Sequence, residues 1–179
     1  MDDSTHLRGL ELGDPAAFAE VYRLHKAAVY RYACALCGRS SEAEDLLQEA
    51  FLGLLRNLDR VDERSPLLPY LLRSVRHRHI DRLRSFAERG CPLPEGALVD
   101  PQPGLEEQLT REERIQAVTA AIGELPESQG EIVRLRVYAG LEYEGIADML
   151  ALPRDTVRSR YRAAIDRLRE RLRRSVGDA

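Results

Sequence analysis

The stretch from Leu141 to Arg174 reads LEYEGIADMLALPRDTVRSRYRAAIDRLRERLRR, and its pattern decides the fold class. Apolar residues recur at three- and four-residue steps on both sides of the connection 151–153. This predicts a helix over about 142–151 and a longer one over about 154–174. Two helices joined by so tight a turn are typical of a helix-turn-helix, whose second helix enters the major groove of DNA. A solvated arginine-rich helix would explain the second half, but not the short helix and the proline-containing turn before it.

The second helix of this segment carries side chains suited to reading DNA. Val157 and Tyr161 are expected to face inward. The residues expected to face outward are Arg154, Asp155, Arg158, Ser159 and Arg162. Arginine can form two parallel hydrogen bonds to the O6 and N7 atoms of guanine, so this face predicts contact with base edges. Arg160 falls on a flank of the helix that is suited to phosphate.

Helical periodicity also organises the N-terminal part of the chain. Asp14, as an N-cap before a proline, begins a long helix that Gly38 ends. The sequence Ser41-Glu42-Ala43-Glu44 has the form of a capping box and is expected to begin the next helix. The helices are expected over about 15–37, 41–59 and 70–86, with a loop over 59–69 before the third.

A proline- and glycine-rich stretch over 87–108 separates this part from the C-terminal part and predicts a linker. Thr110-Arg111-Glu112-Glu113 forms a second capping box, and helices are expected over about 110–124 and 127–138. No strand-like alternation of useful length occurs. The sequence therefore predicts an all-α protein of two small helical domains. Their boundaries are 1–86 for the first, 87–108 for the linker, and 109–179 for the second, which contains the helix-turn-helix.

The charge is unevenly distributed along the chain. The net charge of −3 over 179 residues would by itself argue against a nucleic-acid partner. Residues 1–63 and 91–150 are acidic, with net charges of −5 and −8, whereas residues 64–90 and 151–179 each carry +5. This alternation indicates separate surfaces for separate partners. The chain also lacks a signal-peptide pattern and any apolar run that could insert in a membrane, so we expect a cytoplasmic protein.

The first of the two basic blocks contains a second candidate interface. In the segment 70–84, Tyr70 precedes several arginines and histidines on one broad polar side of the predicted helix. Aromatic groups beside arginines are what proteins use to bind single-stranded DNA, through stacking and neutralisation of the backbone. Taken alone, a solvated helix face explains this pattern equally well.

The sequence shows no constellation typical of an enzyme. It lacks a nucleophile–base pair, a glycine-rich phosphate loop and a credible metal cluster, so we expect neither catalysis nor a cofactor. Cys34 and Cys37 fall in a helical pattern and are interpreted as buried, reduced core residues, although a thiol- or zinc-based switch with Cys91 is an alternative. The run 77–79, His-Arg-His, is interpreted as part of a basic face and not as a metal-ligand pair.

Several segments together resemble one known family. The sequence EDLLQEAF over Glu44–Phe51 resembles the core-binding helix of bacterial RNA polymerase sigma factors. The segment 70–84 is similar to their promoter −10 helix. Leu125-Pro126, followed by LEYEGIADML over 141–150, resembles their −35-reading domain. The brevity of the chain is similar to that of the extracytoplasmic-function (ECF) group. The resemblance covers about 14–84 and 110–173.

This resemblance implies a factor that directs core RNA polymerase to promoter DNA by binding the β′ clamp helices and the β flap, and that an anti-sigma factor holds inactive. It implies that the loop 59–69 and the following helix hold the unpaired non-template strand, including an extruded base. The residues implied at the core polymerase are Asp45, Gln48, Glu49 and Leu52. Those implied at the −10 element are Tyr70, Arg73, Arg76, His77 and Arg84. Those implied at the −35 element are Arg154, Thr156, Arg158, Ser159, Arg160 and Arg162.

The chain departs from the family pattern at a few positions. Tyr70 and His77 stand where the family commonly has Trp and Asn, which affects the expected −10 sequence preference more than the fold. Ala151 replaces the usual glycine of the helix-turn-helix turn, a mild cost if this residue needs a positive φ. The alternative function is a stand-alone DNA-binding regulator whose residues 1–90 form a sensor or dimerisation module.

Overall fold

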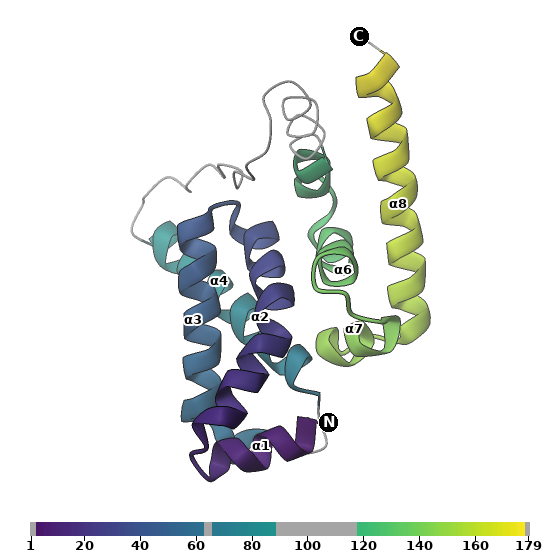
Figure 1. The fold of residues 1–179 in the computed structure, drawn as a ribbon. Coiled ribbons are helices and arrows are strands. Elements are labelled where there is room, and N and C mark those ends of the chain that lie inside the picture. Colours follow the sequence, from purple (N-terminus) through teal and green to yellow (C-terminus); the bar gives the residue numbers. More distant parts are fainter. Residues whose placement is uncertain (1–2, 63–65, 89–117, 178–179) are drawn as a thin grey trace, which may run out of the picture. The chain divides into compact units, whose positions relative to one another are not determined.

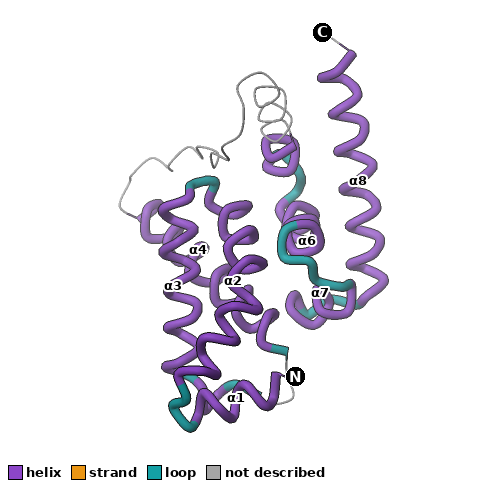
Figure 2. The backbone as a smooth tube through the Cα atoms, viewed as in Figure 1, coloured by secondary structure: helices purple, strands orange, loops and turns teal. Residues whose placement is uncertain are grey.

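The computed structural model describes residues 3–62, 66–88 and 118–177, and every regular element in these ranges is a helix (Figure 1). The tube in Figure 2 accordingly shows helices and connecting loops over the described ranges. The predicted all-α class is confirmed. The chain divides into two compact units, residues 1–97 and 98–179. Most of the predicted linker 87–108 and the capping box Thr110–Glu113 lie outside the described residues.

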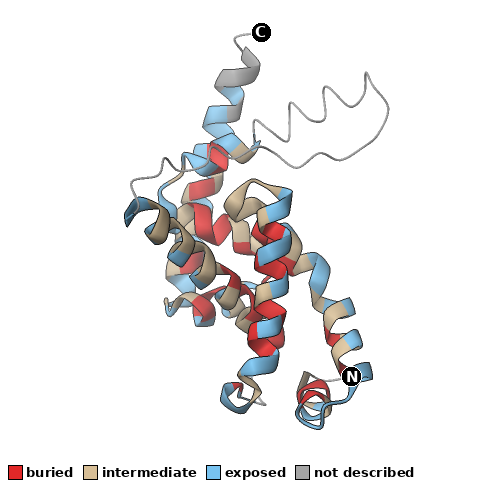
Figure 3. Cartoon of the chain, turned by 90° about the vertical axis from the view of Figure 1, so that its left-hand side faces the viewer, coloured by how far each residue is buried: buried red, intermediate tan, exposed pale blue. Residues whose placement is uncertain are grey.

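The first unit is a bundle of four α-helices and one short 3₁₀ helix. Its elements are α1 (Asp3–Glu11), α2 (Pro15–Cys37), α3 (Ser40–Arg56), the 3₁₀ helix η1 (Leu58–Arg60) and α4 (Leu67–Glu88). The helix α2 packs against α1, α3 and α4, and α3 packs against α4. The apolar stripes of these helices meet in a common core, so that buried residues line the inner faces of the helices (Figure 3). Fully buried members include Val21, Tyr32, Leu46, Leu54 and Leu71.

The long helix α2 has the caps that its sequence predicts. A side-chain oxygen of Asp14 accepts a hydrogen bond from the backbone N–H of Ala16 at 2.9 Å, and Pro15 occupies the first helical position. At the other end, Gly38 adopts the left-handed conformation with φ of 70°, and its N–H donates to the carbonyl of Cys34. Both predicted ends of this helix are therefore confirmed.

The start and end of α3 differ from the prediction. The helix begins at Ser40, and its N-cap is Arg39, whose extended backbone makes no side-chain capping bond. The capping box predicted over 41–44 is therefore wrong. Glu42, which falls in the first turn, instead accepts a hydrogen bond from the Arg39 guanidinium at 3.0 Å. The helix also ends at Arg56, before the predicted Asp59, because the chain tightens into η1.

The helix α4 begins earlier than predicted, at Leu67 rather than Tyr70. Pro69 is compatible with this start because a proline in the first turn has no intrahelical N–H bond to lose. The prediction also missed α1, whose short, mostly polar sequence has a weak apolar stripe. This helix buries His6, Leu7 and Leu10. It packs tightly on α2, since a Cβ atom added at Gly9 would lie 2.6 Å from that of Ala17.

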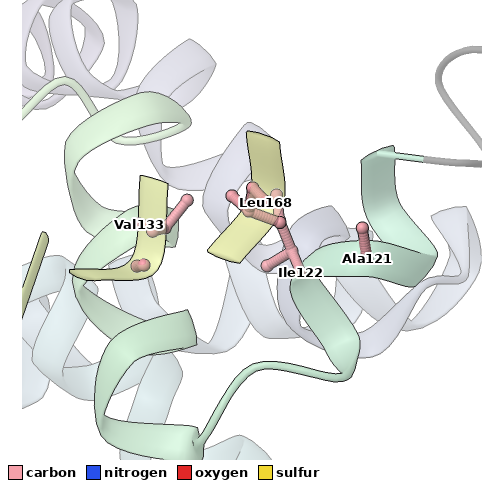
Figure 4. Packing of buried hydrophobic residues seen from close by; sticks show 5 residues of the cluster. Ala121, Ile122, Val133 and Leu168 are labelled. Atoms are coloured by element: carbon pink, nitrogen blue, oxygen red, sulfur yellow. The ribbon is translucent and has the colours of Figure 1, made fainter. Parts of the chain in front are cut away.

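The second unit contains helical residues 118–123 and the helices α6 (Glu127–Val137), α7 (Tyr143–Leu150) and α8 (Arg154–Gly177). The helix α8 packs against both α6 and α7. One part of the core joins the 118–123 segment to α6 and α8 (Figure 4). Its buried residues are Ala121, Ile122, Val133, Ala164 and Leu168. These helices agree with the predicted ranges from residue 127 onward to within a few residues.

Candidate nucleic-acid and partner interfaces

The turn between α7 and α8 depends on one residue in an uncommon conformation. Ala151 ends α7 in the left-handed region, with φ of 52° and ψ of 47°, and is the only non-glycine residue with positive φ in the described part of the chain. The N–H groups of Ala151 and Leu152 both bond to the carbonyl of Ala147, the latter at 3.0 Å. The expected mild cost of an alanine here therefore applies, because L-residues disfavour this region.

The arginine face of α8 forms as the helical period predicts. Val157 is fully buried and Tyr161 is half-buried, and both face α7 or the core. Arg154, Arg158, Ser159 and Arg162 are exposed. Thr156 and Arg160 are half-buried and lie about 160° around the helix axis from Arg158. The structure thus brings Arg154, Arg158 and Arg162 within about 80° of one another around the helix axis, with Ser159 about 60° beyond Arg162, and leaves Thr156 and Arg160 off that face.

Tyr143, the first residue of α7, makes the central contacts of this surface. The guanidinium groups of Arg136 and Arg158 lie over its ring, at 5.1 Å and 5.6 Å from the centroid. The Tyr161 ring meets it edge-on, with 5.8 Å between centroids. These contacts hold Arg158 in place while leaving its charge exposed. The residues around the resulting open groove are Tyr143, Arg158, Tyr161, Arg162, Ile165, Asp166 and Arg169.

Two ion pairs fix the edges of the helix-turn-helix. Arg136 donates to the backbone carbonyl of Leu141 at 2.8 Å and lies 2.7 Å from the Glu142 carboxylate, which raises the pKa of this arginine. At the start of α8, Arg154 lies 2.6 Å from the Glu144 carboxylate of α7. The first predicted DNA-reading arginine is therefore already partnered within the protein.

The helix α4 presents a second basic face. Arg73, His77 and Arg84 are exposed, and Tyr70 is half-buried. With about 100° per residue, these four side chains fall within about 60° of one another around the helix axis. Arg76 is half-buried at the edge of this group. The structure thus supports a shared basic side with Tyr70 at its N-terminal end.

The side chains on another side of α4 face α3 and contact its carboxylates. Arg78 and Arg82 bond the two oxygens of Glu49 on α3, at 3.2 Å and 3.0 Å, and Arg82 also lies 4.0 Å from Asp45. His79 is largely buried, 3.8 Å from Glu42. The prediction that residues 77–79 lie together on a basic face is therefore wrong for Arg78 and His79. The period of the helix turns them toward α3 while His77 faces solvent.

The exposed side of α3 combines polar and apolar groups. Asp45, Gln48 and Leu52 lie on it, and Leu55 extends it by one turn. Leu52 and Leu55 are among the large apolar side chains that remain exposed, at 47% and 39%. Glu49 lies at the edge of this side, with its carboxylate held by α4. A solvent-exposed leucine pair flanked by polar groups is typical of a protein-binding surface.

Cys34 and Cys37 are the cysteines in the described part of the chain. Cys34 and Cys37 are half-buried rather than fully buried, and burial raises the pKa of both thiols. The Cys37 thiol donates to the backbone carbonyl of Ala33 at 3.1 Å. Within the residues that the structure describes, no group of three or more His, Cys, Asp and Glu side chains could hold a metal ion. Cys91 lies outside these residues.

Among the described helices, none is long and apolar enough to span a membrane.

Comparisons with known proteins agree on one family. The family model for Sigma-70 region 2 matches residues 21–89, and that for Sigma-70 region 4 matches residues 121–170. The chain is 32% identical over 168 residues to the ECF RNA polymerase sigma factor SigK of Mycobacterium tuberculosis, covering 91% of this chain and 89% of that protein. It is 26% identical to the ECF RNA polymerase sigma factor SigW of Bacillus subtilis, covering 93% and 95%.

Two solved structures share the fold. CnrH, solved in complex with the cytosolic domain of CnrY, superposes with a TM-score of 0.73 at 20% identity, covering 95% of this chain and 96% of that one. The sigma factor RpoE of Bartonella quintana, solved with the anti-sigma factor NepR, superposes with a TM-score of 0.71 at 24% identity, covering 87% and 96%.

Proposed function

This chain belongs to the ECF group of sigma-70 RNA polymerase sigma factors, and on this premise we propose how its two units divide the recognition of polymerase and promoter. A protein of this family directs promoter-specific initiation of transcription. The comparisons do not favour the alternative of a stand-alone regulator with a sensor module. The observation that carries the division of roles is the presence of two separate basic faces, one on α4 and one on α8.

The second unit is proposed to read the −35 element. Arg154, Arg158 and Arg162 share one exposed side of α8, with Ser159 at its edge, and Arg158 lies over the ring of Tyr143 on α7. Arginine in this position can bond guanine in the major groove. Thr156 and Arg160, on another side of α8, are proposed to contact the phosphate backbone. The same unit would also bind the β flap.

The first unit is proposed to bind the −10 element. The exposed side of α4 offers Tyr70 for stacking on an unpaired base, and Arg73, Arg76, His77 and Arg84 for the sugar–phosphate backbone. Extruding a base costs a few kcal/mol, which stacking and charge neutralisation can offset. The predicted loop 59–69, of which residues 63–65 lie outside the described part of the chain, is proposed to complete this site.

The exposed side of α3 is proposed to bind the β′ clamp helices of core polymerase. Its central residues are Asp45, Gln48 and Leu52, with Glu49 at the edge. An anti-sigma factor, as in the solved complex of the related RpoE, is a further proposed partner. These roles involve binding without covalent chemistry, and they place the protein in the cytoplasm, where polymerase meets the chromosome.

The core-binding face can be tested with a matched pair of leucines. Leu52 on α3 is 47% exposed and Leu24 on α2 is 44% exposed, so either can be replaced by aspartate without opening the core. We expect Leu52→Asp to weaken binding to core polymerase by about tenfold or more, since a buried charge at an interface lacks a partner. Leu24→Asp should bind core as the wild type does. Equal binding of both variants, measured by fluorescence titration of core, would contradict this role.

Promoter binding without polymerase separates the sigma-factor function from the alternative. In a gel-shift assay we expect the chain alone to bind promoter DNA weakly, because the overall charge of the chain is negative. The holoenzyme should bind the same DNA tightly. Tight, sequence-specific binding by the isolated chain as a dimer would instead indicate the stand-alone regulator.

A further inference from the structure

The first residue of α4 is hydrogen-bonded to a side chain of α1, a helix far from it in the sequence. The Oδ2 atom of Asp3, at the start of α1, accepts a hydrogen bond from the backbone N–H of Leu67 at 2.8 Å. Leu67 is the first residue of α4 and is fully buried. The two residues are 64 positions apart in sequence. The contact is therefore a tertiary cap and not a local turn.

The sequence before α4 cannot supply this cap by itself. The first N–H groups of a helix have no intrahelical acceptor, and a side-chain oxygen just before the helix usually takes one of them. Here the preceding residue is Pro66, which has no side-chain acceptor. The carboxylate of Asp3 takes that place, and its charge is favourable at the positive end of the helix dipole.

Asp3 is itself positioned by the rest of the unit. Its other oxygen, Oδ1, lies 3.7 Å from Nε2 of His25 on α2, whose side chain is largely buried. Three buried residues, His6, Leu7 and Leu10, anchor α1 on the bundle. A shift of α4 relative to α1 would therefore break the hydrogen bond from Leu67 to Asp3, because α1 is packed on the bundle and could not move with α4.

The helix α1 also contacts η1, the element that precedes α4 in the sequence. The helix α1 packs against η1, after which Val61 is buried. Besides its packing on α2, α1 therefore contacts η1 and, through Asp3, the first residue of α4. Tyr70, the proposed stacking residue, follows Leu67 by about one helical turn.

We propose that Asp3 is a positioning residue for −10 recognition. This inference rests on the proposed −10 role of α4. Asp3 touches no DNA in this scheme. It acts through Leu67 by holding the first turn of α4, and with it Tyr70, where an extruded base can stack.

The test compares two aspartate caps of the same unit. Asp14 caps α2 by accepting a hydrogen bond of 2.9 Å from the N–H of Ala16. Asp14→Ala therefore removes a similar bond at a position far in sequence from Leu67 and Tyr70. Each variant is assembled with core polymerase. Initiation is measured on a promoter selected from a randomised pool with the wild-type holoenzyme, and on the same promoter with its −10 bases replaced. The readout is the ratio of the two initiation rates.

We expect Asp3→Ala to lower this ratio by about fivefold, which is the effect of a helix cap worth about 1 kcal/mol. Asp14→Ala should lower the melting temperature similarly but leave the ratio unchanged. Asp3→Asn should keep the ratio near that of the wild type, because its amide oxygen can accept the same bond. Binding to core should be equal for all variants, since none of the changes lies on the exposed side of α3.

An unchanged ratio for Asp3→Ala, or an equal fall for Asp14→Ala, would overturn the proposal and leave Asp3 a purely structural cap. If Asp3→Ala does not fold, Asp3→Glu, which keeps the charge but moves the oxygens by one methylene, gives the same readout. A fall in its ratio supports positioning, and an unchanged ratio overturns it. Failure of the proposed function would look different, because the wild-type holoenzyme would then initiate from no promoter of the pool.

Discussion

The two arginine-rich helices, α4 and α8, use their arginines in different ways. On α4, Arg78 and Arg82 turn inward to the Glu49 carboxylate of α3 and hold the bundle together. On α8, Arg158 lies over the Tyr143 ring and its charge stays exposed. A carboxylate neutralises an arginine, whereas an aromatic ring orients it and leaves it able to bind an anion. Because Arg154 on α8 also pairs with a carboxylate, that of Glu144, the same argument favours Arg158 over Arg154 as the main contact with DNA.

The largest expected effect is at Arg158, where the comparison predicts a functional role. A bidentate contact between arginine and guanine is worth about 1–3 kcal/mol, so we expect Arg158→Ala to lower initiation from a −35-dependent promoter by about 10- to 100-fold. The measurement is in vitro transcription with core polymerase on templates with and without the −35 element.

Arg173 provides the control for loss of one positive charge from α8. It is exposed, and it lies about 22 Å further along the helix than Arg158. Arg173→Ala should change initiation little. If Arg158→Ala reduced transcription equally on templates lacking the −35 element, its role would be structural, and the contrast between α4 and α8 would fail.

The opposite role is expected for Glu49, which receives the two inward arginines of α4. Glu49→Ala should lower the free energy of unfolding by about 1 kcal/mol, because two charge-assisted hydrogen bonds are lost at a partly exposed site. Urea unfolding monitored by circular dichroism gives this value. Glu20→Ala removes a two-bond pair with Arg23 that is shorter, at 2.9 Å and 2.6 Å, but lies within one turn of α2 at an exposed site, and it should have no measurable effect. An equal change in the free energy of unfolding for both variants would show that the ion pairs of Glu49 with α4 do not stabilise the first unit.

A smaller effect is expected at the turn that orients α8. Replacing Ala151 by glycine relieves its left-handed conformation but adds freedom to the unfolded chain. We expect Ala151→Gly to stabilise the second unit by about 0.5 kcal/mol, seen as a higher melting temperature. Ala163→Gly, in the middle of α8, should destabilise it by up to about 1 kcal/mol. Destabilisation by both changes would mean that Ala151 carries no strain.

The smallest effect concerns the pH dependence of the first unit, which holds α4 in place. Burial lowers the pKa of His25, and His6 adds to this while Asp3 opposes it. As pH falls through about 6.5, the unfolded chain takes up a proton on this residue before the folded one does. The unit is therefore expected to be most stable above this pH and to lose stability below it. His25→Asn should lose less stability than the wild type between about pH 7.5 and 5.5. A steeper loss in the variant would reverse the assigned direction.

Local patterns in the sequence predicted much of the fold and part of the site. The caps of α2 at Asp14 and Gly38 and the tight turn before α8 depend on neighbouring residues, and each forms as expected. The helical period also placed Arg158 and Arg162 on the exposed side of α8. These features depend on residues within about four positions of one another.

Other features depend on partners that the local pattern does not contain. The inward direction of Arg78 depends on where Glu49 of α3 lies, and the role of Tyr143 depends on its contact with Arg158 across two helices. The helix α1 was missed because its stripe is short and its stability comes from packing on α2. The sequence signals that could have indicated these contacts are Glu49 among the apolar residues of α3 and Tyr143 at the first position of α7.

The amino-acid sequence alone thus determined the helical class, the ends of α2, the helix-turn-helix and the family. These follow from backbone preferences and from periodicity, which act over a few residues. Only the tertiary structure decided which arginines bind carboxylates, which lie on tyrosine rings, and which aspartate caps α4. The bond from Leu67 to Asp3 joins residues 64 positions apart, so it exists only once packing has brought α1 and α4 together.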